Sequence, residues 1–106
     1  MNEQILKELF TVLKQRRKTS EKKSYTSFLI KNPELLAKKI GEESSELIID
    51  LIKKNKQRAI KESADLIYHI LVSWVYLSIT PEEIWNELSS RKSTSGIDEK
   101  RNRGLK

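Results

Sequence analysis

Residues 64–79, ADLIYHILVSWVYLSI, are the most apolar stretch of the chain. On a helix they place apolar side chains around most of the circumference, which is typical of a helix buried in a bundle or at a subunit interface. A membrane-spanning helix needs about 20 such residues, whereas this stretch is shorter and contains Asp65 and His69. It therefore predicts the central helix of a soluble helical protein.

The residues on either side of this stretch carry helix-start signals. Asn32 before Pro33 reads as an N-cap followed by a proline in the first turn. Thr80, Pro81 and Glu83 form a capping box with the same first-turn proline. The predicted long helices cover residues 2–18, 33–54, 57–78 and 81–91, and a short helical or irregular segment covers 25–30.

Composition agrees with an all-α fold. Three glycines and two prolines in 106 residues are too few for a turn-rich β-sandwich, and no segment alternates apolar and polar residues as a strand does. We predict one all-α domain over residues 1–91, a bundle of four to five helices. Dimerisation is expected to complete it, because four thin helices bury such an apolar helix poorly. Residues 92–106 are predicted to be a basic tail, extended or ordered by substrate.

The residue types that are rare in the chain exclude several kinds of chemistry. The absence of cysteine excludes disulfides, thiolate zinc sites and cysteine nucleophiles, and a single histidine excludes a His-rich metal cage. The first 13 residues are amphipathic and interrupted by charge, so we expect no signal peptide. The expected location is the cytoplasm, with no membrane partner.

Charge is unevenly distributed along the chain, whose net charge is +6. Residues 1–31 hold eight basic and three acidic side chains, residues 32–91 hold eight and ten, and residues 92–106 hold five and two. Basic ends indicate a polyanionic partner, either a nucleotide or a nucleic acid. A surface made soluble by lysines would give the same charge, so charge alone does not choose.

The predicted helix at 33–54 carries a row of acidic residues beside its apolar stripe. These residues are Glu42, Glu43, Glu46 and Asp50. One interpretation is a solvated face on which Lys39 and Lys53 form ion pairs with them.

The next helix favours another interpretation. Glu62 and Asp65 lie on a largely apolar helix, where ionised carboxylates cost several kcal/mol unless basic partners, raised pKa values or a metal ion compensate. A short turn between antiparallel helices would bring them opposite Glu43 and Glu46. Four carboxylates without histidine or thiolate suit Mg²⁺ or Mn²⁺ better than Zn²⁺.

The acidic residues also carry a family resemblance. Residues 42–46, EESSE, followed after fifteen residues by 62–65, ESAD, resemble the EExxE…ExxD signature of the all-α (MazG-type) nucleoside-triphosphate pyrophosphohydrolases. The segments that narrow the resemblance to the phosphoribosyl-ATP pyrophosphohydrolase family are 39–43 (KIGEE), 62–69 (ESADLIYH), 24–26 (SYT) and 95–100 (SGIDEK) with Arg103. The resemblance covers residues 6–103, nearly the whole chain.

The resemblance implies an activity and a set of site residues. The activity is Mg²⁺-dependent hydrolysis of phosphoribosyl-ATP to phosphoribosyl-AMP and pyrophosphate, the second step of histidine biosynthesis, by a homodimer. Mn²⁺ could replace Mg²⁺. The implied metal ligands, which are also the catalytic residues, are Glu43, Glu46, Glu62 and Asp65. Glu42 is a further ligand or the base that takes a proton from water.

Other residues are candidates for binding the substrate. The candidates for phosphate are Arg16, Arg17, Lys38, Lys39, Lys100, Arg101 and Arg103. Ser24, Tyr25 and Thr26 could bond the substrate, although Tyr25 could equally pack. His69 is a further candidate for binding the substrate, and we expect it to act as a core residue or to support a ligand rather than to react.

Two alternatives stay open from sequence. A house-cleaning nucleoside-triphosphate pyrophosphohydrolase would share the acidic motifs, but the Ser-Tyr-Thr segment and basic tail disfavour it. A basic helical nucleic-acid-binding module would explain the charge but not Glu62 and Asp65, so we expect no nucleic-acid partner. The chain has no room for a cyclohydrolase domain, so phosphoribosyl-AMP cyclohydrolase is expected to be a separate protein.

Overall fold

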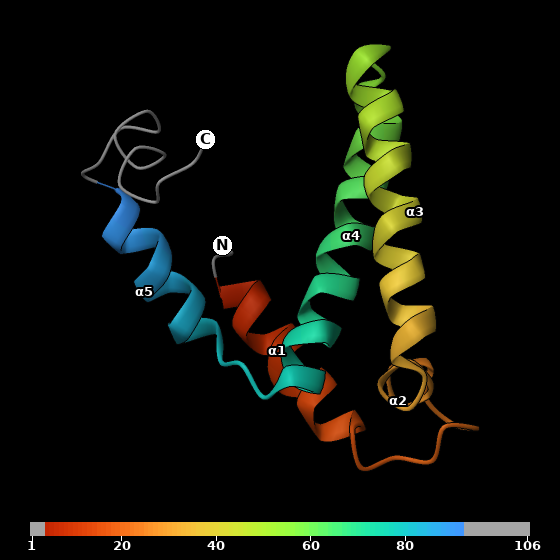
Figure 1. The fold of residues 1–106 in the computed structure, drawn as a ribbon, viewed down its shortest axis with the longest axis vertical. Helices are drawn as coiled ribbons and strands as arrows, with labels where there is room; N and C mark the ends of the chain where they lie inside the picture. Colours follow the sequence, from red (N-terminus) through yellow and green to blue (C-terminus); the bar gives the residue numbers. More distant parts are fainter. Residues whose placement is uncertain (1–3, 93–106) are drawn as a thin grey trace, which may run out of the picture.

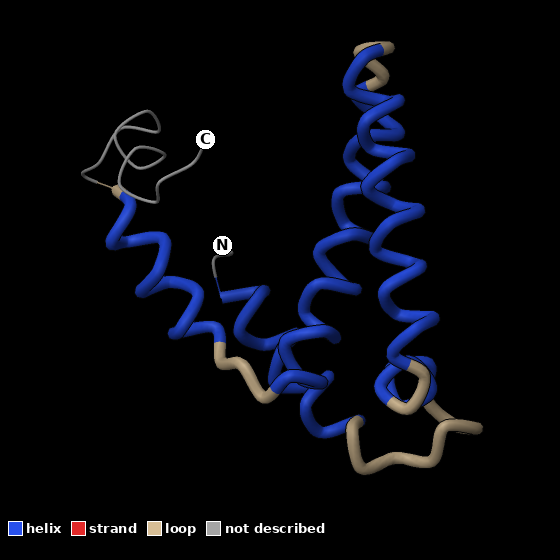
Figure 2. Tube along the Cα trace, in the orientation of Figure 1, coloured by secondary structure: helices blue, strands red, loops and turns tan. Residues whose placement is uncertain are grey.

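The structure is a computed structural model that describes residues 4–92. Its elements are α1 (Gln4–Arg16), α2 (Tyr25–Ile30), α3 (Pro33–Ile52), α4 (Lys56–Leu77) and α5 (Pro81–Arg91). Helices connected by short loops make up this part of the chain, which contains no strand (Figure 2). The all-α prediction is confirmed, and residues 25–30 are a helix. The predicted tail lies outside the described residues.

The helix starts follow the capping signals. Thr80 and Glu83 form the predicted capping box at the start of α5. Asn32 is the N-cap of α3, but its side chain makes no capping bond there and instead donates from Nδ2 to the carbonyl oxygen of Phe28 at 2.7 Å. Asn55 caps α4 by accepting a hydrogen bond from the Arg58 amide at 3.2 Å.

An antiparallel hairpin of α3 and α4 dominates the fold (Figure 1). Residues 53–55 turn the chain between the two helices, and Lys54 takes the left-handed conformation with φ 56°. A glycine would adopt this conformation without steric strain. The turn contains no glycine, so Lys54 takes the left-handed conformation instead. The hairpin places the amino-terminal half of α4 beside the carboxyl-terminal half of α3.

The apolar core lies at the end of the hairpin away from this turn, where α1 and α2 pack on it (Figure 1). Its buried members are Phe10, Leu13, Leu29, Leu36, Leu71, Val72 and Val75. Because α2 packs on α1, α3 and α4, its position against α4 is fixed. The site described below depends on that position.

The remaining surface leaves apolar side chains uncovered. Leu51 and Ile52 near the hairpin turn, and Ile67 and Leu77 on α4, are exposed. The helix α5 extends away from the hairpin, and its Trp85 ring meets Trp74 edge-on at 6.1 Å. The expected burial of α4 is therefore not achieved within one chain.

No single helix among residues 4–92 is long and apolar enough to cross a membrane, and α4 with α5 meets the length and composition criteria only as a pair bent by 111°.

Candidate active site

The hairpin brings two acidic pairs together. Glu43 and Glu46 lie on α3, and Glu62 and Asp65 lie on the facing part of α4. A hydrogen bond with Glu46, burial, and the charges of Glu46 and Asp65 raise the pKa of Glu62 to about 7, although Arg58 opposes the shift. These interactions place Glu46 and Asp65 near Glu62, on facing parts of the hairpin.

Glu43 occupies the more enclosed side of this cluster. Burial raises the pKa of its carboxyl, an effect that the nearby His69 reduces and the charge of Asp65 reinforces. Asp65 itself is exposed, as is Glu46. The cluster therefore has a buried edge at Glu43 and Glu62 and an open edge at Glu46 and Asp65.

The donor chemistry of this cluster fits a hard divalent cation. Oε2 of Glu62 is buried and finds no hydrogen-bond partner within the described chain, and Oε1 of Glu43 is buried and meets Nδ1 of His69 at 2.7 Å without an aligned hydrogen bond. Unpaired carboxylate oxygens are the ligands that Mg²⁺ prefers. No three acidic or histidine side chains of residues 4–92 are placed closely enough to hold a metal ion together. The fit rests on the oxygen donors and their missing partners, and not on a formed coordination shell.

Glu42 lies apart from this cluster. Its side chain is exposed, and Oε1 lies 3.7 Å from Nζ of Lys39 one turn earlier on α3. The interpretation of a solvated face expected Lys39 to form an ion pair on this helix. Lys39 does so, with Glu42 as its partner, and the pair lies at the edge of the site.

The Ser-Tyr-Thr segment docks α2 beside α4. Oγ of Ser24 accepts from the Ser27 amide and caps α2, and Thr26, which is 1% exposed, places Oγ1 2.7 Å from the Tyr68 hydroxyl. These two hydroxyls are used within the protein, so they order α2. Tyr25 differs, because 47% of it is exposed.

Tyr25 also contacts His69, the buried histidine of α4. The Tyr25 hydroxyl lies 3.1 Å from Nε2 of His69, while Nδ1 lies 2.8 Å from the carbonyl oxygen of Asp65 and 2.7 Å from Oε1 of Glu43. His69 therefore connects the Ser-Tyr-Thr segment to the acidic cluster. It has no direct access to solvent, being 5% exposed.

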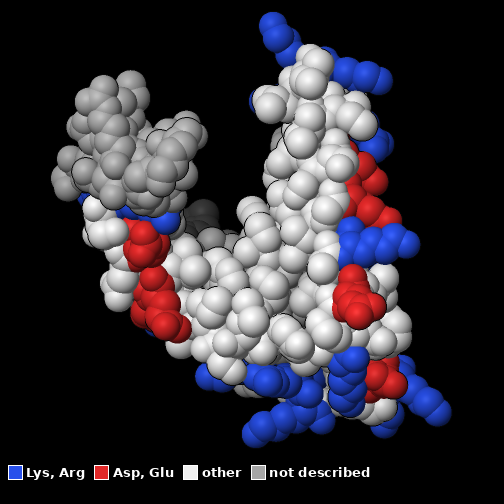
Figure 3. Space-filling view, in the orientation of Figure 1, with Lys and Arg blue, Asp and Glu red and all other residues white. Residues whose placement is uncertain are grey.

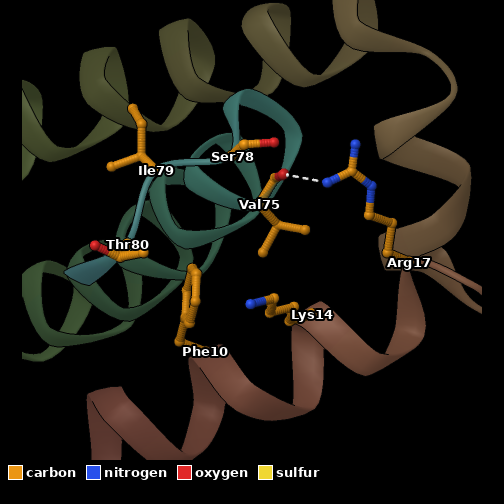
Figure 4. Close-up of a pocket in the computed structure, with 7 residues that line it drawn as sticks. All are labelled: Phe10, Lys14, Arg17, Val75, Ser78, Ile79 and Thr80. Carbon is orange, nitrogen blue, oxygen red and sulfur yellow. Dashed lines mark hydrogen bonds between the residues drawn. The ribbon is translucent and has the colours of Figure 1, made fainter. Parts of the chain in front are cut away.

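The predicted phosphate-binding cations are dispersed. Arg17 donates from Nη1 to the carbonyl oxygen of Val75 at 3.0 Å, beside a cavity of about 170 Å³ near the end of α4 (Figure 4). Arg16 and Lys38 are exposed. Figure 3 shows Lys and Arg gathered at the end of the molecule where α1 and α2 lie, and acidic side chains along α3. Lys100, Arg101 and Arg103 lie outside the described residues.

Two neighbours of the site were given no role in it from sequence. Asp50 is 4% exposed, and its Oδ1 lies 3.4 Å from Nε of Arg58. Its place in the acidic row of α3 was the available signal, but the predicted partner was Lys53. Tyr68 precedes His69 in the family segment, and only the structure shows that its hydroxyl meets Thr26.

Comparison with known proteins supports the resemblance. Residues 6–92 match the family of phosphoribosyl-ATP pyrophosphohydrolases. A phosphoribosyl-ATP pyrophosphatase of Paramagnetospirillum magneticum is 42% identical over 96% of this chain and 94% of its own length. The proteins of that name from Geobacter metallireducens and Sulfolobus acidocaldarius are 42% and 38% identical, over 97% and 86% of this chain and 97% of their own lengths in both cases. The chain belongs to the phosphoribosyl-ATP pyrophosphohydrolase family.

Proposed function

We propose that this protein hydrolyses phosphoribosyl-ATP to phosphoribosyl-AMP and pyrophosphate with the help of Mg²⁺. The observation that supports the proposal best is that Glu43, Glu46, Glu62 and Asp65 interact with one another across α3 and α4, and that a buried oxygen of Glu62 has no hydrogen-bond partner among residues 4–92. A family member with this cluster has the oxygen donors that a phosphoanhydride hydrolase needs. The relatives' names supply the substrate.

The substrate carries negatively charged phosphates, so a binding site made of acidic residues needs a cation between the two. Carboxylates alone would repel a polyphosphate, so Glu43, Glu46, Glu62 and Asp65 act by holding a cation. Bound Mg²⁺ would neutralise phosphate charge and orient a water for attack. On the family resemblance, Glu42 is proposed as a further ligand or as the base that takes the proton of that water, and its carboxylate lies at the edge of the site beside Lys39.

The rim of the cluster supplies the proposed substrate contacts. Tyr25 offers an exposed ring and Lys39 a cation at this rim, and Lys38 and Arg16 are accessible to phosphate. Ser24 and Thr26 contribute indirectly by ordering α2. Lys100, Arg101 and Arg103 are retained as candidates on the family resemblance.

We also propose a homodimer. Below its tip, the side of the hairpin that faces α5 is mostly uncharged in Figure 3, and Leu51, Ile52, Leu77 and Leu88 are exposed. A second copy would cover such surface and bury the apolar faces of α4 and α5. The product, phosphoribosyl-AMP, would pass to a separate cyclohydrolase.

The test is pyrophosphate release from phosphoribosyl-ATP with and without Mg²⁺. We expect Mg²⁺-dependent release by the wild type and a loss of at least about 100-fold in Glu46→Gln, because the change removes one charged ligand. Glu34→Gln, an exposed position on the same helix, is the matched control and should retain activity. Equal turnover of ordinary nucleoside triphosphates would favour the house-cleaning alternative, and no release by folded wild type would overturn the proposal.

A further inference from the structure

His69, the single histidine of the chain, lies where α2, α3 and α4 meet. Its two ring nitrogens contact different elements. Nε2 faces the Tyr25 hydroxyl at 3.1 Å, while Nδ1 faces Oε1 of Glu43 at 2.7 Å and the carbonyl oxygen of Asp65 at 2.8 Å. The imidazole thus joins an exposed tyrosine to two members of the acidic cluster.

These neighbours determine where the neutral ring carries its hydrogen. The Asp65 carbonyl and an ionised Glu43 can only accept, so Nδ1 must be the protonated nitrogen. Its hydrogen bond runs to the carbonyl, and Oε1 of Glu43 lies beside the same N–H without an aligned hydrogen bond of its own. Nε2 is then left with a lone pair, which accepts a hydrogen from the Tyr25 hydroxyl.

Two aromatic rings fix the plane of the imidazole. Tyr68 meets it edge-on at 5.0 Å and 90°, and Tyr25 at 5.9 Å and 88°. The two tyrosine rings in turn stack on each other at 6.1 Å and 10°. With the ring held this way, its N–H cannot turn away from Glu43 without breaking the contact to Tyr25.

We propose that His69 is a positioning residue that holds the Glu43 carboxylate beside Asp65, and that the contact of the Tyr25 hydroxyl with Nε2 keeps the ring turned so that Nδ1 faces Glu43. The inference rests on the proposed function, because that function makes Glu43 a metal ligand. Groups that orient metal ligands typically contribute about 10- to 100-fold to metal affinity.

Two substitutions of His69 separate its two nitrogens. The amide of His69→Asn can take the place of Nδ1 and donate toward Glu43, whereas that of His69→Gln reaches the place of Nε2 and can bond Tyr25 only. We expect Mn²⁺ affinity, measured by calorimetry on the full chain, to stay within about threefold of wild type in His69→Asn. In His69→Gln it should fall by about tenfold or more. Turnover of phosphoribosyl-ATP should follow the same order.

The outcomes distinguish the inference from the proposed function. Equal Mn²⁺ affinities for all three proteins, or a greater loss in His69→Asn, would overturn the role of His69 while leaving the enzyme assignment intact. A wild type that neither binds Mn²⁺ nor releases pyrophosphate would overturn both. Circular dichroism of each variant shows whether a lower affinity comes from unfolding.

A second measurement does not depend on the His69 variants. With one histidine in the chain, ¹⁵N NMR reads its tautomer without ambiguity, and we expect a protonated Nδ1 and an unprotonated Nε2 in the wild type. Tyr25→Phe should keep this tautomer, because the Asp65 carbonyl and Glu43 still face Nδ1, but it should bind Mn²⁺ more weakly, because the ring loses its contact at Nε2. Tyr76→Phe, an exposed tyrosine on the same helix as His69, is the control and should change neither. A wild type with its hydrogen on Nε2, or a Tyr25→Phe variant that binds Mn²⁺ as tightly as wild type, would overturn the proposal.

Discussion

Nε of Arg58 on α4 lies 3.4 Å from Oδ1 of Asp50 on α3, and the pair ties the two arms of the hairpin together near its turn. The two side chains differ in environment, because that of Asp50 is buried while that of Arg58 is largely exposed. The second oxygen of Asp50, Oδ2, is buried without a hydrogen-bond partner in the described region. The position of Asp50 therefore depends heavily on one arginine.

Removing that arginine should destabilise the hairpin. We expect Arg58→Met to lower the free energy of unfolding by about 1–3 kcal/mol, because buried Asp50 loses its counter-charge. The double variant Asp50→Leu/Arg58→Met should recover most of the loss, since no buried charge is left unpaired. Urea unfolding of the wild type, both single variants and the double variant measures the coupling, and a single Arg58→Met change without effect would contradict the prediction.

The buried hydroxyl pair between α2 and α4 should also contribute to stability. Thr26→Val keeps the volume but leaves the Tyr68 hydroxyl without its partner at 2.7 Å, so we expect a loss of about 1–3 kcal/mol. In the double variant with Tyr68→Phe the loss should be smaller than the sum of the single losses. Thermal unfolding provides the comparison, with Tyr76→Phe as an exposed control. Additive losses would show that the two hydroxyls do not interact.

The acidic cluster predicts a pH dependence of stability in the absence of divalent cations. The pKa of Glu62 is raised from 4.5 to about 7 by its hydrogen bond with Glu46, by burial and by the nearby charges. Between these values the folded protein retains a proton that the unfolded chain has released, so its stability falls as pH rises. With a chelator present, the midpoint of thermal unfolding should decrease from about pH 5 to about pH 8, the range that this pKa shift covers.

Two variants identify the group responsible. Glu62→Gln cannot release a proton and should flatten this decrease, whereas Glu34→Gln should leave it unchanged, because Glu34 is exposed at the start of α3. A decrease of the same size in Glu62→Gln would assign it to other groups.

The end of α4 offers a stabilising substitution. Ser78 closes the helix in the left-handed conformation, with φ 59° and ψ 36°. Glycine adopts this conformation without steric cost, so Ser78→Gly should raise the free energy of unfolding by about 1 kcal/mol. Ser89→Gly within α5 should instead lower it by about 0.5–1 kcal/mol. Chemical denaturation distinguishes them, and a loss of stability in Ser78→Gly would contradict the expectation.

Much of the fold follows from local signals in the sequence. Proline in the first turn and the Thr80–Glu83 capping box mark helix starts that the structure reproduces, because caps act between residues a few positions apart. The acidic motifs follow from spacing too, since an antiparallel hairpin with a short turn brings residues 43–46 opposite residues 62–65. Family membership also follows from the order of the motifs along the chain, without knowledge of their contacts.

The side-chain contacts between different helices could not be predicted from the sequence. The sequence suggested that Lys53 would neutralise Asp50, yet Arg58 does so from α4. Arg17, a candidate phosphate ligand, donates from Nη1 to the Val75 carbonyl at the end of α4, a contact that the sequence did not predict. Long side chains have many acceptors within reach, and packing between helices selects among them.

The sequence by itself therefore determined the helices, the acidic motifs and the family. Only the tertiary structure decided that Ser24 and Thr26 order α2 while Tyr25 stays exposed. It alone brought His69 into contact with both Tyr25 and Glu43. Those contacts arise where α2, α3 and α4 pack against one another. The spacing of residues along one helix does not predict which side chains of three helices come into contact.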